Sequence, residues 1–293
     1  MKKILITGAN SFIGTSFEKY VSQWPEQYRV DTVDMIDGSW REKSFAGYDT
    51  VYHVAGIAHS DVGHVTEERK AQYYKVNTDL TIETAKKAKK DGVKQFIFMS
   101  SAIVYGDSAP IGKSKRIDKD TPVAPANFYG DSKVKAEEGI LALDDNSFRV
   151  CVLRPPMIYG PGSKGNYPML ARLAQKLPAF PAVENERSML YVGNLMEFVR
   201  LMVENEESGI FWPQNERHVK TCEMVKVIAE VHGRKIVMVK GFGWALKLLS
   251  HVTGLVNKAF GNLTYEETIS RYNADYRVCS FEESIRRTEG VKS

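Results

Sequence analysis

The first fourteen residues constrain the fold of this chain more than any other stretch. A short apolar, β-branched run at 3–7 is followed by Gly8 and then by a helical pattern that contains Gly14. A strand, a glycine turn and a helix in this order are the context that a dinucleotide-binding loop requires. Gly8 permits the tight turn, and Gly14 allows the helix and the strand to approach closely. The start of the chain therefore predicts a dinucleotide-binding turn.

The middle of this loop departs from the usual three-glycine pattern. Ser11 occupies the position of the second glycine, which places a small side chain near the expected phosphates and also supplies a hydroxyl donor. The amides around Ser11, Phe12 and Ile13 would face the pyrophosphate at the positive end of the helix dipole. The alternative interpretation is a strand, turn and helix that bind nothing.

An acidic residue follows the second expected strand. The run Tyr28–Val33 ends at Asp34, twenty residues beyond Gly14. A carboxylate at this strand end can accept hydrogen bonds from an adenosine ribose and would repel a 2′-phosphate, which favours NAD over NADP. In the alternative interpretation, Asp34 only begins a turn.

Small or hydroxylic residues end the next two expected strands. The strand at 50–54 leads into Ala55 and Gly56, whose size leaves room for a cofactor against the backbone. The strand at 95–100 is followed by Ser101, whose hydroxyl would lie at the same edge of the sheet. Both strands therefore place candidate site residues at the cofactor crevice.

Two helices add further candidates. Asn77 stands near the start of the helical stretch 76–90, either as a helix cap or as a support for the active site. Tyr129 and Lys133 are four residues apart and so share one helix face. A free tyrosine has a pKa of about 10, and a nearby ammonium lowers it by favouring the phenolate. The pair is therefore a candidate proton-transfer device beside a sugar or alcohol hydroxyl.

The alternation of strands and helices up to about residue 158 predicts a Rossmann-like, doubly wound parallel sheet. The prolines and glycines that follow mark a change of pattern, so we expect an NAD-binding domain at 1–158 and a smaller substrate-binding lobe at 159–293. The chain is expected to return to the first domain near 187–210. The proline-containing stretch 107–127 is expected to be a surface excursion.

Composition limits the classes of function. Hydrophobic residues make up 43% of the chain and charged residues 26%, as in soluble globular proteins, and a net charge of +4 gives no support for nucleic-acid binding. Cys151, Cys222 and Cys279 have no metal-like spacing, so we expect no metal site and a reducing cytoplasm. No apolar run is long enough to span a membrane, and the stretch 242–256 is interpreted as a core or interface helix, with membrane attachment as the alternative.

Taken together, these motifs resemble the extended short-chain dehydrogenase/reductases, and most closely their NAD-dependent nucleotide-sugar epimerase/dehydratase branch. The resemblance covers nearly the whole chain. It implies that Tyr129 is the acid/base, that Lys133 holds the nicotinamide ribose and lowers the tyrosine pKa, and that Ser101 hydrogen-bonds the reacting hydroxyl. It also implies that Asn166 and Arg187 contact the diphosphate of a nucleotide sugar, with a surface charge as the alternative for Arg187.

Differences from the family pattern narrow the expected activity. Dehydratases carry Thr-Asp-Glu where this chain has Ser101, Ala102 and Ile103, so elimination lacks its acid and base. UDP-galactose-type epimerases have Asn where this chain has Met157. The leading hypothesis is a UDP-sugar 4-epimerase with NAD. The alternatives are an NAD(P)H-dependent 4-keto reductase of a nucleotide deoxy sugar and a non-catalytic NAD-binding regulator. The resemblance further implies a homodimer.

Overall fold

The structure is a computed structural model that describes residues 1–57, 65–241, 246 and 254–291. The chain forms two compact units, each built from several segments. The first unit comprises Met1–Gly106, Pro122–Pro155 and Met196–Pro213. The second unit comprises Asp107–Thr121, Pro156–Leu195 and Gln214–Ser293. The predicted domain boundary lay at 158 and 159, and the expected return segment 187–210 overlaps Met196–Pro213.

The first unit contains a parallel sheet of six strands among its described residues, in the order β10-β6-β4-β3-β1-β2. This confirms the predicted Rossmann-like architecture. The strands are β1 (Lys2–Thr7), β2 (Tyr28–Val33), β3 (Thr50–His53), β4 (Gln95–Met99), β6 (Arg149–Leu153) and β10 (Gly209–Phe211). The central strands β3 and β4 are buried along their whole length because helices cover both faces of the sheet.

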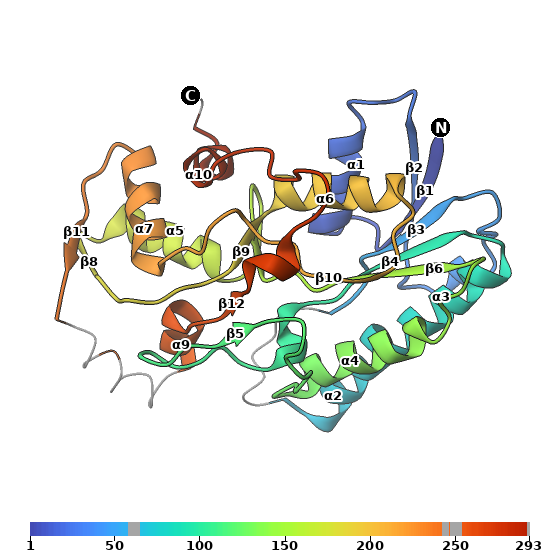
Figure 1. Ribbon diagram of the computed structural model, residues 1–293, viewed down its shortest axis with the longest axis horizontal. Helices are drawn as coiled ribbons and strands as arrows, with labels where there is room; N and C mark the ends of the chain where they lie inside the picture. Colours follow the sequence, from blue (N-terminus) through green and yellow to red (C-terminus); the bar gives the residue numbers. More distant parts are fainter. Residues whose placement is uncertain (58–64, 242–245, 247–253, 292–293) are drawn as a thin grey trace. The chain divides into compact units, whose positions relative to one another are not determined.

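Figure 1 shows α1 and α6 on one face of this sheet and α2, α3 and α4 on the other. Their bounds are α1 (Phe12–Val21), α2 (Glu67–Tyr73), α3 (Leu80–Lys90), α4 (Phe128–Leu141) and α6 (Val192–Glu204). Three short helical turns accompany them: η1 (Ser39–Arg41), the π-helical η2 (Tyr74–Asp79) and η3 (Ala102–Tyr105). The π-helical turn joins α2 to α3, so the predicted helix at 76–90 has an irregular start.

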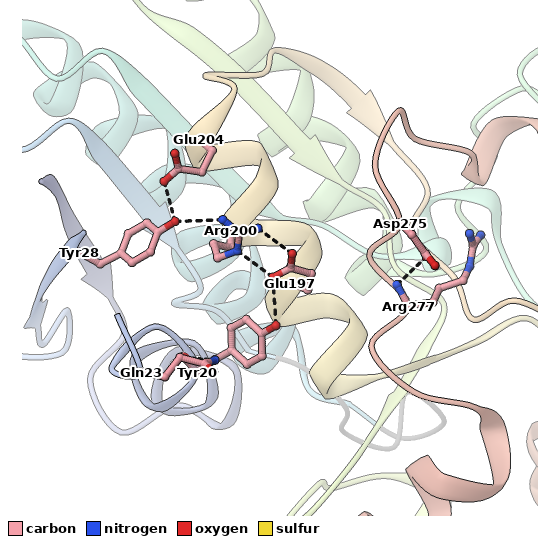
Figure 2. Close-up of polar contacts among 8 residues, drawn as sticks. All are labelled: Tyr20, Gln23, Tyr28, Glu197, Arg200, Glu204, Asp275 and Arg277. Atoms are coloured by element: carbon pink, nitrogen blue, oxygen red, sulfur yellow. Dashed lines mark hydrogen bonds and ion pairs between the residues drawn. The ribbon is translucent and has the colours of Figure 1, made fainter. Parts of the chain in front are cut away.

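A polar cluster fixes the second half of α6 to α1 and β2 (Figure 2). The phenol of Tyr20 donates to Glu197 at 3.0 Å, and that of Tyr28 donates to Glu204 at 2.6 Å. The Arg200 guanidinium donates to both oxygens of Glu197 at 2.7 and 2.8 Å. A two-pronged arginine–carboxylate pair of this kind fixes orientation as well as distance. The cluster thus orders the helix that precedes the edge strand β10.

The second unit consists of short elements among its described residues. Its strands form three parallel pairs: β5 (Arg116–Ile117) with β12 (Thr264–Tyr265), β7 (Met157–Tyr159) with β9 (Met189–Tyr191), and β8 (Ala179–Pro181) with β11 (Val237–Val239). Its helices are α5 (Asn166–Lys176), α7 (Thr221–Val231), α9 (Gly254–Phe260), η4 (Glu267–Ser270) and α10 (Phe281–Glu289). Helices α5 and α7 lie side by side (Figure 1).

The stretch 107–127, which we expected to be a surface excursion, is exposed or partly exposed at all of its residues except two, and it also contains a short strand. Its first part belongs to the second unit, where β5 pairs with β12, and Ile111 and Ile117 are buried. Apolar residues spaced through a polar segment gave too weak a pattern to reveal a two-residue strand. Most of the stretch 242–256 lies outside the described residues. None of the described helices is long and apolar enough to cross a bilayer, and the three cysteines form no disulfide.

Candidate functional site

The glycine turn has the conformation that its sequence requires. Gly8 has a φ of +97°, and a Cβ at this position would lie 2.9 Å from the backbone nitrogen of Ala55. Only glycine combines this φ with so close an approach to β3. The side chain of Ser11 caps α1 by accepting the Gly14 amide at 3.1 Å, and Asn10 also has a positive φ of +61°. The positive φ of Gly8 and its close approach to Ala55 therefore require glycine at this position of the turn.

Helix α1 leaves donors at its start. Its own hydrogen bonds begin at Thr15, whose amide donates to the Ser11 carbonyl at 2.9 Å. The amides of Phe12 and Ile13 therefore have no acceptor within the helix, and they lie at the positive end of its dipole. A Cβ on Gly14 would lie 2.7 Å from the Ser11 hydroxyl oxygen, so the capping conformation of Ser11 requires glycine at position 14. This is the donor set that a diphosphate group fits.

Asp34 follows the last residue of β2 directly and is exposed. One oxygen of its carboxylate accepts the amide of Ile36 at 2.8 Å, which is the turn-forming bond of the alternative interpretation. A carboxylate has about four acceptor positions, so one backbone amide leaves capacity for a ribose hydroxyl. The structure thus shows a turn residue that can also serve as a ribose ligand.

Asn77 is fully buried and is not a helix cap. It lies in the π-helical turn η2, a type of turn that often occurs at functional sites. Its side-chain oxygen accepts the Ile57 amide at 2.8 Å, while its nitrogen donates to the Ile57 carbonyl and the Ser132 hydroxyl, both at 3.1 Å. Ser132, in turn, donates to the carbonyl of Tyr129 at 2.8 Å. Asn77 therefore links the segment after β3 to the helix that carries Tyr129.

Ser101 and Tyr129 meet through their hydroxyl groups. Ser101 precedes η3, and Tyr129 lies in the first turn of α4, which Asn127 caps by accepting the Gly130 amide at 3.0 Å. Burial raises the pKa of Tyr129 to about 12, an effect that the hydrogen bond with Ser101 opposes and the neighbouring Tyr73 reinforces. The structure thus brings together the serine and the tyrosine that the sequence singled out.

Lys133 lies on the same face of α4 but does not lower the tyrosine pKa in this structure. Its ammonium donates to the Met99 carbonyl at 2.9 Å and lies 4.6 Å from the centre of the Phe98 ring. Burial lowers the pKa of Lys133 to about 8, and the carboxylate of Glu137 opposes that change. A Cβ on Gly56 would lie 3.4 Å from the Lys133 nitrogen, so the small residue after β3 faces this ammonium.

These positions define one site edge in the first unit. The carboxyl ends of four neighbouring parallel strands carry the glycine turn, Asp34, the Ala55 and Gly56 pair, and Ser101. Backbone bonds hold them in register: the Gly8 amide donates to the Val33 carbonyl at 3.0 Å, and the Val54 amide donates to the Thr7 carbonyl at 3.2 Å. Ligands of open α/β sheets bind outside this edge.

Asn166 and Arg187 belong to the second unit. Asn166 is the first residue of α5, and Gly165 before it has a φ of +94°. Arg187 is half-buried, unlike the exposed surface charge of the alternative interpretation, and its burial lowers the pKa of the guanidinium to about 10. One of its nitrogens donates to the carbonyl of Ala259 at 3.1 Å. A half-buried arginine suits an anionic ligand, and its role remains a prediction.

Sequence reasoning missed several polar residues behind this edge. Ser132 and Glu137 flank Lys133 on α4, and Arg154 follows β6. The one available signal was that Glu137 stands four residues after Lys133, which places both on one helix face. His53 is fully buried at the end of β3, and its ring nitrogens lie 2.7 and 3.0 Å from the hydroxyls of Thr7 and Thr81.

The residues present fit a dinucleotide. The first-turn amides of α1 suit a diphosphate, Asp34 suits a ribose, and the backbone approach at Gly8 and Gly56 suits a flat ring system against the strand ends. The pairing of a tyrosine and a lysine on α4 with Ser101 lies at the same edge. This combination can bind a nicotinamide dinucleotide and can move a proton at a hydroxyl beside it.

Comparisons with known proteins agree with this geometry. A family model described as the NAD dependent epimerase/dehydratase family matches residues 4–211. The chain is 29% identical over 290 residues to a UDP-glucose 4-epimerase of Vibrio cholerae. The matched region covers 89% of this chain and 86% of the relative.

Two further comparisons cover most of the chain. It is 30% identical over 247 residues to an N-acetyl-α-D-glucosaminyl-diphospho-ditrans,octacis-undecaprenol 4-epimerase of Escherichia coli O157:H7, over 78% of this chain and 71% of the relative. The crystal structure of a dTDP-4-dehydrorhamnose reductase from Bacillus anthracis in complex with NADP covers the whole of both chains, with a TM-score of 0.75 and 19% identity. That similarity shows a shared fold.

Proposed function

Because this chain belongs to the NAD-dependent epimerase/dehydratase family and is an enzyme of the extended short-chain dehydrogenase/reductase type, we propose that it is a 4-epimerase of a nucleotide-activated hexose. The observation that carries the proposal is the hydrogen bond between Ser101 and Tyr129 at the strand edge that also holds the glycine turn. Two relatives support the choice of a 4-epimerase, since the proteins of Vibrio cholerae and Escherichia coli O157:H7 are both 4-epimerases by name. A UDP-sugar is the proposed substrate.

The proposed chemistry needs a proton to leave and return at the C4 hydroxyl of the sugar. Tyr129 would exchange this proton, and Ser101 would hold the reacting oxygen through its own hydroxyl. NAD, when bound, supplies the acceptance and return of a hydride at C4. The pKa of about 12 makes the Tyr129 phenol a proton donor at neutral pH, so the phenolate form requires a positive charge close to the ring.

The remaining predicted residues have binding roles in this proposal. Gly8, Ser11, Phe12, Ile13 and Gly14 would hold the diphosphate of NAD. Asp34 would bind the adenosine ribose, and Ala55, Gly56, Asn77, Tyr129 and Lys133 would line the nicotinamide half. Asn166 and Arg187 would contact the diphosphate of the sugar nucleotide. These assignments follow from the family resemblance and from the donor groups described above.

The direct test is Tyr129→Phe, which removes one oxygen and keeps the ring. Turnover of UDP-sugars, followed by separation of the C4 epimers, should fall by about 10²- to 10⁴-fold or more, the usual contribution of acid–base catalysis. Binding of NAD, measured by calorimetry, should stay within about threefold of the parent. Full activity in this variant would rule out Tyr129 as the acid/base.

The reductase alternative is supported by Met157, which stands where UDP-galactose-type epimerases have Asn; the fold shared with a dTDP-4-dehydrorhamnose reductase is compatible with it. The same residues would then transfer one proton and one hydride in a single direction. Incubation with sugar nucleotides separates the two functions. An epimerase should need no added NADH and should carry bound nicotinamide through purification, whereas a reductase should consume one NADH for each product formed. Binding of NAD without turnover of any sugar nucleotide would instead favour a regulator.

The assembly belongs to the proposal as well. The resemblance suggests a homodimer formed through the helices near 78–90 and 130–143. Sedimentation equilibrium at micromolar concentration measures this directly, and a mass equal to one chain of 33.0 kDa would contradict it.

A further inference from the structure

A buried ion pair lies directly behind the candidate site. The guanidinium of Arg154 donates to the carboxylate of Glu137 through Nε at 3.1 and 3.2 Å and through Nη2 at 2.5 Å. The two side chains are only 8% and 3% exposed. A buried ion pair is a weak source of stability, because removing two charges from water costs about as much as their attraction returns. The role of this pair is therefore sought in the fixed positions that it gives to the segments it joins.

The pair holds the turn that carries Ser101 at both ends. The hydroxyl of Ser100 donates to Glu137, and Nη1 of Arg154 donates to the phenol oxygen of Tyr105 at 2.7 Å. Ser100 immediately precedes Ser101, and Tyr105 is the last residue of η3, the turn that follows Ser101. The indole of Trp212, next to the end of β10, donates to the same phenol oxygen at 2.7 Å. Two donors thus fix one oxygen at the far end of the turn.

The pair also fixes the helix that carries the catalytic candidates. Glu137 lies one turn after Lys133 on α4, and both are buried. Its carboxylate favours the ammonium of Lys133, whereas burial disfavours it. Three other titratable groups belong to this cluster. His53 from β3 is neutral because its pKa is lowered to about 3, and Tyr129 from α4 is protonated at neutral pH. Arg154, after β6, is the cation that shares the Glu137 carboxylate. Glu137 is thus the nearby anion that acts on Lys133.

We propose that Glu137 and Arg154 are positioning residues of this site. Their ion pair sets the placement of Ser101 against Tyr129, and the Glu137 carboxylate keeps the buried Lys133 ammonium charged at neutral pH. The inference rests on the proposed function for its catalytic part only. The charge on Lys133 is a property of the folded chain and is measurable without turnover.

The test replaces Glu137 by glutamine, which keeps the shape and an acceptor for Ser100 but removes the charge. Protein labelled with ¹³C at the lysine ε carbon reports each ammonium by NMR, and Lys133→Met identifies the Lys133 signal by its disappearance. In Glu137→Gln the Lys133 signal should titrate about one pH unit lower than in the parent, which is about a tenfold increase in the acid dissociation constant of the ammonium. The alkaline limb of the turnover profile should move by the same amount.

Glu138→Gln is the matched control, because Glu138 is the next residue on the same helix and is exposed. It should leave the Lys133 titration and the rate unchanged. Folded Glu137→Gln protein with a parent-like Lys133 titration would overturn the electrostatic role. Because this readout needs no substrate, it also separates a failure of this inference from a failure of the epimerase proposal, which the Tyr129→Phe variant tests.

Two milder variants test the geometric role and cover the case in which Glu137→Gln does not fold. Ser100→Ala and Trp212→Phe each remove one hydrogen bond at one end of the turn. Each should lower kcat by about ten- to a hundredfold with KM for NAD unchanged, because misplacement of the serine affects the reacting geometry. The Lys133 titration should stay parent-like in both. Lowered melting temperatures with parent kcat in both variants would reduce the network to a purely structural role and overturn the proposal.

Discussion

His53 should make the stability of the first unit sensitive to acid. Its ring is fully buried between β1 and α3, and its two nitrogens are hydrogen-bonded to Thr7 and Thr81. The Thr81 hydroxyl donates to the Asn77 carbonyl at 2.8 Å, so it must accept from Nε2 of His53. Nδ1 then accepts from Thr7. A neutral ring with its proton on Nε2 satisfies every partner, and a second proton on Nδ1 would face a donor.

The magnitude follows from the shift in the histidine pKa. Burial, with a contribution from the Lys133 ammonium, lowers the pKa of His53 from 6.5 to about 3. Below pH 6.5 His53 is protonated in the unfolded chain but stays neutral in the folded chain, so the free energy of unfolding falls as the pH falls toward 3. The whole effect is about 5 kcal/mol, and the part between pH 7 and pH 5 is about 2 kcal/mol.

The perturbation is His53→Gln, which keeps a donor and an acceptor but cannot be protonated. Urea unfolding at pH 7 and pH 5, followed by tryptophan fluorescence, gives the free energy of unfolding of both proteins. The parent should lose about 2 kcal/mol more than the variant between these two values of pH. The variant itself should be less stable at pH 7, because the two threonine bonds are imperfectly replaced.

Comparing the two proteins at two pH values cancels the carboxylates that both share. Lys133→Met provides a second check, because loss of the ammonium should ease protonation of His53 and reduce the acid sensitivity of the parent. If the parent and His53→Gln lost equal free energy between pH 7 and pH 5, the assignment of a neutral, buried His53 would be refuted.

Two further predictions concern cofactor binding. Gly8→Ala should abolish NAD binding in calorimetry and should lower the melting temperature, because the added Cβ would lie 2.9 Å from the backbone of Ala55. Gly47→Ala is the control, because Gly47 has a similar φ of +85° with open space around it; this variant should lose only about 1 kcal/mol of stability and should still bind NAD. Equal effects of the two substitutions would contradict the steric argument. Asp34→Ser should raise the affinity for NADP relative to NAD by at least tenfold without altering the melting temperature, since the side chain is exposed, and an unchanged ratio of the two dissociation constants would remove Asp34 from the ribose site.

The sequence by itself determined the parts of this protein that depend on local patterns. The strand, glycine turn and helix at 3–14 predicted a parallel α/β fold because only glycine serves where the chain must turn and pack closely at once, and Gly8 has the expected positive φ. The four-residue spacing of Tyr129 and Lys133 placed them on one helix face, because helix geometry is set by the backbone. The order of strands along the chain predicted which strand ends meet.

Only the tertiary structure decided what surrounds these residues. The sequence predicted that Lys133 lowers the pKa of Tyr129, but the ammonium donates to the Met99 carbonyl, and burial raises the tyrosine pKa instead. The ion pair of Glu137 with Arg154 joins residues seventeen positions apart on different elements, which no local period encodes. Burial and pairing depend on contacts between distant segments, so a linear pattern can name the candidate groups of a site without fixing their charges.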